Sequence, residues 1–299
     1  MANIPILQNP VTTKELRSRM RGRRAFVVLT IYLLLMSGFV SMVYLVYAAA
    51  ANNPFGPDPR LAGKTIFGTV VGIQVLLVIY IGPAFTAGAI TGEKERQTYN
   101  LLRTTLLPAR ALVTGKLVSS LGYVFLLVLA SLPIQSIAFL LGGVSLIEMV
   151  VAELLILVSA VAFALIGLFY SSLMRSTLAA SISTFATALF LTVGLPSAAL
   201  IILPLIGGVF FNPVIASPVA EVVLTYIGLM LASTNLPATI VISEILLLQE
   251  DALFYTMQTI GGYTVTILSP WTLYLVLYTL LAVILYVLAV SRVRRIPDR

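Results

Sequence analysis

Long apolar stretches alternate with short polar stretches along the chain, and this alternation predicts membrane-spanning helices. Apolar runs of about 20 residues are long enough to cross a bilayer. Six such spans are expected, at roughly 25–50, 66–90, 112–141, 148–173, from about 177 onward, and 271–291. The expected fold is therefore an all-α membrane protein, with residues 1–299 forming a single transmembrane domain.

The segment 207–269 interrupts this pattern before the last span. It holds two shorter apolar runs, roughly 219–232 and 237–249, which are bounded by prolines and carry Glu221 and Glu244. Apolar runs of about 10–14 residues favour re-entrant or interfacial helices. We expect an extracytoplasmic or re-entrant segment here, although two additional spans would keep the C-terminus on the same side of the membrane.

Composition and charge agree with a membrane protein. The chain has 60% hydrophobic and 10% charged residues, whereas soluble domains carry about 25% charged residues. All 18 Lys and Arg residues except Arg60 and Lys64 fall on one side if the chain crosses six times. Positive charge gathers on the cytoplasmic side, so a plasma-membrane protein with both termini in the cytoplasm is expected. The net charge of +7 therefore does not indicate nucleic-acid binding.

The first 24 residues are polar and basic, and they predict an interfacial helix on the membrane surface. Thr12 and Glu15 have the spacing of a capping box, and Leu16 and Met20 share one helical face among arginines. A basic amphipathic helix of this kind binds anionic lipid. A disordered basic tail is the alternative.

One strongly charged segment, 91–103, separates the second and third spans. Four consecutive charged residues, Glu93 to Arg96, lie near its start, and a bilayer core does not accommodate such a run. The segment is therefore expected in water or at the membrane surface. Thr91 is expected to cap a short helix over 91–106.

Helical periodicity gives this helix a polar and an apolar side. Glu93, Gln97 and Asn100 fall on the polar side, where they are available to another molecule, while Glu95 falls among the apolar residues. An ordinary charged loop is the alternative interpretation.

The run from Glu93 to Thr98, followed by Leu101-Leu102, Leu107-Pro108 and Gly115-Lys116, resembles the permease subunits of ABC-2 type ABC transporters. The resemblance extends to Asn9-Pro10 with Glu15-Leu16-Arg17, and to the turn Met174 to Thr177. In that family this charged element is the cytoplasmic coupling helix that docks on the ATPase subunit. The resemblance implies that the coupling residues are Glu93, Lys94, Glu95, Arg96, Gln97 and Asn100.

The same resemblance implies a membrane-spanning permease subunit of an exporter that is driven by ATP hydrolysis in a separate ATPase subunit. That ATPase would hold ATP and Mg²⁺. The chain's own Gly63-Lys64-Thr65 mimics the end of a P-loop, but Asp58 stands where the pattern needs glycine. Six spans are half of the family's usual set, so a second permease subunit is expected, either an identical copy or a related chain.

By analogy with this family, spans two and five line the translocation route. Gln74 lies within span two, and Ser181 and Thr184, with Thr187 nearby, lie along one face of span five. These four residues are candidate path residues, and the alternative role is helix packing. Glu153 lies inside span four and is expected to reach the outer headgroup water.

Other function classes fit the residues less well. The chain has no His and no Cys, which removes the common zinc ligands and the commonest general base. We therefore expect no enzyme activity, metal or cofactor in the chain itself. An ion-coupled secondary transporter and a non-transporting membrane scaffold remain alternatives, and the first usually carries ionisable residues near the membrane centre.

Overall fold

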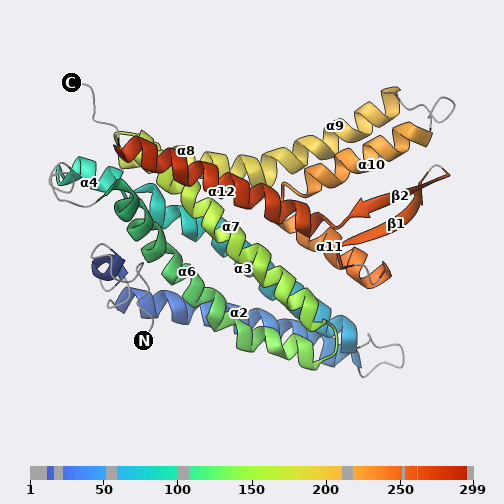
Figure 1. Ribbon diagram of the computed structural model, residues 1–299. Coiled ribbons are helices and arrows are strands. Elements are labelled where there is room, and N and C mark those ends of the chain that lie inside the picture. Colours follow the sequence, from blue (N-terminus) through green and yellow to red (C-terminus); the bar gives the residue numbers. More distant parts are fainter. Residues whose placement is uncertain are drawn as a thin grey trace, which may run out of the picture. The chain divides into compact units, whose positions relative to one another are not determined.

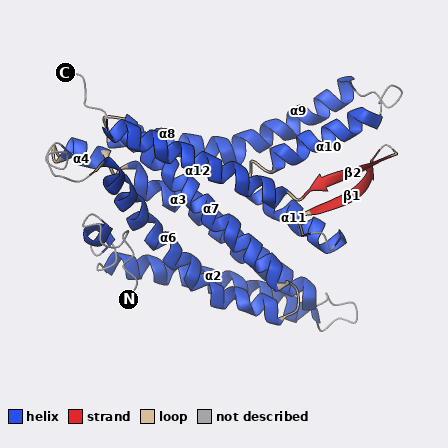
Figure 2. Cartoon of the chain, viewed as in Figure 1, coloured by secondary structure: helices blue, strands red, loops and turns tan. Residues whose placement is uncertain are grey.

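The computed structural model describes residues 12–16, 23–51, 59–99, 108–210, 218–250, 253–260 and 262–294. Within these residues the chain is mostly helical, with one pair of strands (Figure 2). In chain order the elements are α2 (Arg23–Ala51), α3 (Pro59–Ala87), α4 (Thr91–Glu95), α6 (Ala109–Leu140), α7 (Leu146–Leu173), α8 (Thr177–Leu189), the π-helix η1 (Phe190–Gly194), α9 (Leu195–Phe210), α10 (Pro218–Ala232), α11 (Leu236–Glu250), β1 (Tyr255–Ile260), β2 (Tyr263–Leu268) and α12 (Pro270–Arg294) (Figure 1).

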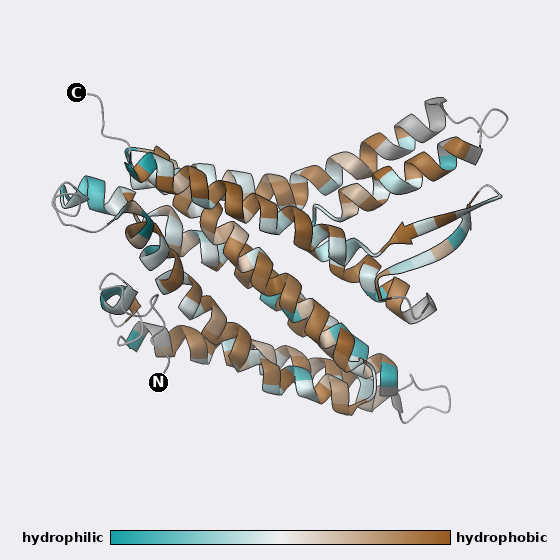
Figure 3. Cartoon of the chain, viewed as in Figure 1, coloured by the Kyte–Doolittle hydropathy of each residue, from teal (hydrophilic) through white to brown (hydrophobic). Residues whose placement is uncertain are grey.

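Among the described residues, six helical segments are long and apolar enough to cross a membrane. They correspond to α2, α3 with its continuation through α4, α6, α7, α8 continued through η1 into α9, and α12. Figure 3 shows hydrophobic residues along α3, α6 and α7 and hydrophilic residues at α4. The prediction of six apolar helices of spanning length is confirmed.

The chain divides into two compact units, Met1–Phe185 with Ala282–Arg299, and Ala186–Leu281. In the first unit α3 packs against α2, α6 and α7. Small side chains allow membrane helices to approach closely. The buried face of α7 is rich in them, at Ala152, Ser159, Ala160, Ala162, Ala164, Gly167 and Ser171.

Helices α3 and α7 lie in close contact where α3 carries an internal proline, Pro83. A Cβ atom on Gly167 would lie 3.0 Å from the Pro83 carbonyl oxygen and would clash with the Thr86 hydroxyl. That hydroxyl donates to the carbonyls of Gly82 and Pro83, each at 3.2 Å. The glycine therefore lets α7 lie directly against the proline-containing turn of α3.

The turn between α6 and α7 lies against the first turns of α3. Gly142 adopts a φ of 74°, a left-handed conformation that glycine adopts without steric cost. A Cβ atom on Gly143 would lie 2.5 Å from the Lys64 backbone nitrogen and would clash with the Arg60 carbonyl oxygen. Ser145 then begins α7 with a capping box that includes Glu148.

The second unit contains α10, α11 and the β1–β2 hairpin. Asn235 begins α11 because its Oδ1 accepts from the Ala238 N–H at 3.0 Å, and its amide donates to the Thr192 carbonyl at 2.8 Å. The Tyr226 hydroxyl of α10 donates to the Thr266 carbonyl of β2 at 2.7 Å. The two short apolar runs of the sequence lie in α10 and α11.

One hairpin accompanies the helices of this mostly helical chain, which is consistent with the expected all-α membrane protein. Strands β1 and β2 pair antiparallel, from Tyr255 opposite Leu268 to Ile260 opposite Tyr263. Both strands are rich in Thr, Tyr and aliphatic residues, which favour strands. The sequence Gly261-Gly262 between two such runs is a hairpin signal that the sequence analysis did not use.

Most of the predicted interfacial helix over 1–24 lies outside the described residues. Residues Thr12 to Leu16 are helical, and α2 already begins at Arg23. The Glu15 carboxylate binds Lys116 and Ser119 of α6.

Replacing Gly143 by alanine should lower the free energy of unfolding by about 1–3 kcal/mol, because the new methyl group meets backbone atoms of α3 that cannot rotate away. Unfolding of the purified chain in detergent measures the effect. The matched control is Gly68→Ala on α3, where a Cβ atom meets nothing within 4 Å. Equal stability of the two variants would contradict the close packing of this turn.

Candidate functional site

The charged segment after α3 is anchored by a residue of α7. Helix α4 follows α3 after a short turn, and its first backbone donors point to the Ser171 hydroxyl. The N–H groups of Ile90 and Thr91 donate to Ser171 Oγ at 2.8 and 3.0 Å. The predicted N-cap, Thr91, instead lies inside α4, where its hydroxyl donates to the Ala87 carbonyl. A residue from a different helix therefore supplies the cap.

Lys94 and Glu95 are neighbours in α4 and bind the adjoining ends of two consecutive helices. The Lys94 ammonium donates to the carbonyls of Ser172 and Met174 at 2.7 and 2.8 Å, at the C-terminus of α7. The Glu95 carboxylate accepts from the Thr177 N–H and hydroxyl at 2.6 and 2.7 Å, at the N-terminus of α8. A cation at a helix C-terminus and an anion at an N-terminus are both favourable.

Glu93 connects α4 to α6 and to the N-terminal segment. Its carboxylate accepts from the Thr98 hydroxyl and lies 3.5 Å from the Lys116 ammonium. Lys116 is buried, and it also pairs with Glu15 at 2.8 Å. The other Glu15 oxygen accepts from Ser119 at 2.8 Å. A buried ammonium with two carboxylate neighbours is compensated for much of the cost of leaving water.

Helix α4 is shorter than the helix predicted over 91–106. It ends at Glu95, and Gln97 has a φ of 59°. The Thr98 N–H donates to the Glu93 carbonyl and the Gln97 N–H to the Lys94 carbonyl, at 3.0 and 3.1 Å. These two bonds form a Schellman motif, which ends a helix. Glutamine occupies the left-handed position that glycine usually holds, so no local residue type signals the end of this helix.

The predicted coupling residues now fall into two groups. Glu93, Lys94 and Glu95 bind other parts of the same chain, as described above. Arg96 and Gln97 are exposed, and no described residue pairs with the Arg96 guanidinium. Asn100 lies outside the described residues.

The predicted path residues do not come together in the described hydrogen bonds. Gln74 is buried among residues of α6 and α7. Thr184 is buried in α8 and donates to the Ala180 carbonyl of its own helix. Ser181 is half-buried on α8, and Thr187 belongs to the second compact unit.

Gln74 belongs to a buried polar cluster that three helices form. Its amide nitrogen donates to Ser131 at 2.6 Å and to Glu153 Oε1 at 3.0 Å. The Gln135 amide nitrogen donates to Gln74 Oε1 at 2.7 Å and to Glu153 Oε1 at 2.6 Å. Glu153 therefore points into the bundle, which corrects the expectation that it reaches headgroup water. Tyr32 of α2 interacts electrostatically with Ser131 and Glu153.

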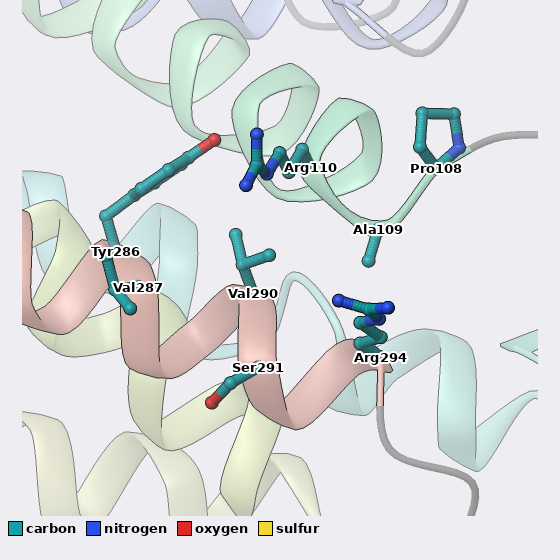
Figure 4. A pocket seen from close by; sticks show the side chains of 8 residues that line it. All are labelled: Pro108, Ala109, Arg110, Tyr286, Val287, Val290, Ser291 and Arg294. Carbon is teal, nitrogen blue, oxygen red and sulfur yellow. The ribbon is translucent and has the colours of Figure 1, made fainter.

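A cavity of about 920 Å³ lies between the start of α6 and the last turns of α12 (Figure 4). Its lining runs from Pro108 to Arg110 on one helix and from Tyr286 to Arg294 on the other. The Tyr286 hydroxyl shares a hydrogen bond of 2.9 Å with Thr114. Arg110 and Arg294 are exposed and form no ion pair with a described residue. Two guanidinium groups beside an apolar wall suit an amphipathic anion.

These features place the chain in the class of helical, multi-pass membrane proteins, with polar groups gathered in one cluster at helix ends and one inside the bundle. No protein-family model matches the sequence, and no curated protein matches it. The described residues contain no group of three His, Cys, Asp or Glu side chains that could hold a metal ion.

Sequence reasoning missed the partners of the charged segment and most of the buried cluster. Ser171 and Thr177 are ordinary residues of apolar helices until the fold brings them to α4. For the buried cluster a signal existed, because polar residues inside apolar spans usually face the bundle interior. That rule, applied to Gln74, Gln135 and Glu153 together, predicts a shared cluster.

Replacing Lys94 by glutamine should destabilise the chain by about 1–3 kcal/mol, because the α7 carbonyls lose a charged donor. Arg96→Gln is the matched control and should change stability by less than about 0.5 kcal/mol. Unfolding in detergent measures both, and amide hydrogen exchange of residues 171–177 locates the effect. If Lys94→Gln leaves both measurements unchanged, the ammonium does not cap α7.

Proposed function

We propose that the chain is the membrane-spanning permease subunit of an ABC-2 type exporter. The resemblance in the charged segment supports this function, and one structural observation carries it further. Helix α4 is covalently continuous with α3 and binds the start of α8 through Glu95. Those two helices are spans two and five, which line the route in the resembling family. A force on α4 therefore acts directly on both of them.

The proposed mechanism is alternating access driven by a separate ATPase subunit, which holds ATP and Mg²⁺. ATP draws two ATPase subunits together, and each pushes on Arg96 and Gln97, the exposed residues that directly follow α4. The push reaches the α7–α8 turn through Lys94 and Glu95, and α6 through Glu93. ATP can bias the bundle only if the docked ATPase interacts unequally with its two conformations.

This function places the α4 end of the bundle in the cytoplasm of a plasma-membrane protein, together with both chain termini. A second permease subunit, identical or related, completes the transporter. Membrane lipid is the remaining partner, and the two arginines beside the cavity in Figure 4 suit an anionic headgroup at this membrane face. The function involves no nucleic acid.

Charge reversal of Arg96 tests the docking. The chain is co-expressed with the proteins encoded by its neighbouring genes, and ATP hydrolysis and transport by the purified complex are measured in proteoliposomes. Arg96→Glu should reduce stimulated ATP hydrolysis about tenfold, because a docking contact becomes repulsive. Unfolding stability should stay unchanged, since Arg96 pairs with no described residue.

Arg292→Glu is the matched control, because Arg292 is also an exposed arginine near a helix end but belongs to α12. It should leave coupling intact. Transport that proceeds without any ATPase, or equal activity of the two variants, would refute the proposed docking site.

The route is tested with cysteine substitutions, because the chain contains no cysteine. Ser181→Cys and Thr184→Cys should react with a hydrophilic thiol reagent in at least one nucleotide state. Ser159→Cys, on the buried face of α7, is the control and should stay protected. Gln74→Cys should react only if the buried polar cluster around Gln74 opens. Protection of the cysteines at positions 74, 181 and 184 in every nucleotide state would exclude this route.

A further inference from the structure

The buried cluster around Glu153 has fewer donors than acceptors. Both hydrogens of the Gln74 amide are used, on Ser131 and Glu153, and both hydrogens of the Gln135 amide are used, on Gln74 and Glu153. The Ser131 hydroxyl donates to the Val128 carbonyl at 2.6 Å. No hydrogen on these three side chains remains for another bond.

Three buried oxygens near this cluster have no hydrogen-bond partner among the described residues. They are Glu153 Oε2, Gln135 Oε1 and the Tyr32 hydroxyl. The Gln135 side chain is fully buried, and Tyr32 is 6% exposed. They come from α7, α6 and α2. Buried polar atoms are normally paired, so unpaired oxygens from three helices indicate a missing partner.

The Tyr32 hydroxyl has a hydrogen of its own to donate, so the two oxygens that still lack a donor are Glu153 Oε2 and Gln135 Oε1. The polar groups around Glu153 are the Gln74 amide of α3, the Ser131 hydroxyl and Gln135 amide of α6, and the Tyr32 phenol of α2. Among these described polar groups, the Tyr32 phenol is the other titratable one besides Glu153. On α7 itself, Glu148 is turned to the Ser145 backbone. Both described ion pairs belong to Lys116, so no described Lys or Arg pairs with Glu153.

We propose that Glu153, Gln135 and Tyr32 form a binding site for one monovalent cation inside the bundle, either a proton or an alkali ion. A proton on Glu153 Oε2 makes that oxygen a donor for a neighbouring acceptor. A sodium ion would instead accept lone pairs from the oxygens of the site. In both cases the negative charge of the carboxylate inside the bundle is neutralised. The site requires neither ATP nor an ATPase subunit, so it is independent of the proposed function.

Thermal unfolding of the full chain in lipid nanodiscs tests the site. The midpoint is measured over a pH series and in sodium chloride against choline chloride. A ligand that binds the folded state stabilises it by mass action, so the wild-type midpoint should rise by about 4 °C on acidification or on adding sodium. A response to pH alone assigns a proton, and a response to sodium assigns an alkali ion.

Glu153→Gln should abolish this response. Glu148→Gln is the matched control, because it changes a half-buried acid at the start of the same helix and glutamine still suits a capping box. It should respond as the wild type does. Identical responses of wild type and Glu153→Gln would overturn the proposal.

A second measurement on the wild type keeps the test decisive if Glu153→Gln does not fold. Infrared spectroscopy over the pH series counts protonated carboxyl groups that are protected from exchange with deuterated water, and equilibrium dialysis measures bound radioactive sodium. One protected carboxylic acid or one bound sodium per chain supports the site. Finding neither overturns it.

Discussion

The structure around α4 depends on one contact, in which Lys94 and Glu95 pair with two opposed helix ends. A short turn joins α7 to α8, and a tight turn of this kind brings a carbonyl-rich C-terminus next to an N-terminus with unpaired donors. A single side chain cannot satisfy both ends. Two adjacent residues of opposite charge on α4 do so, and the turn becomes part of the α4 surface.

This contact requires α3 and α7 to lie very close together. Gly167 and Ser171 are one turn apart on α7. They contact two consecutive parts of the same chain, the Pro83 turn of α3 and the start of α4. A larger side chain at Gly167 would separate the helices and remove Ser171 from the backbone donors that it caps. The glycine, the serine cap and the Lys94 contact therefore form one continuous interface, in which helix packing positions the polar groups.

The apolar pattern was sufficient to predict the spans, because hydrophobic length alone decides which segments can cross a bilayer. It failed at α4, where the stop depends on a left-handed glutamine and the cap comes from Ser171, neither of which has a local signature. It failed at Glu153 because a single residue shows its charge but not its partners, and those lie on helices far away in the sequence.

A displacement of α4 has unequal consequences for the helices that it holds. The α3–α7 contact is tight, since backbone atoms meet at Gly167, and it resists sliding. Within the described chain, few residues of the helical segment from Thr177 to Ile202 are buried, so packing constrains this segment less. It also contains η1, a π-helical turn of a type often found at functional sites. A push on α4 would therefore move the start of α8, through Glu95, more readily than it would separate α3 from α7.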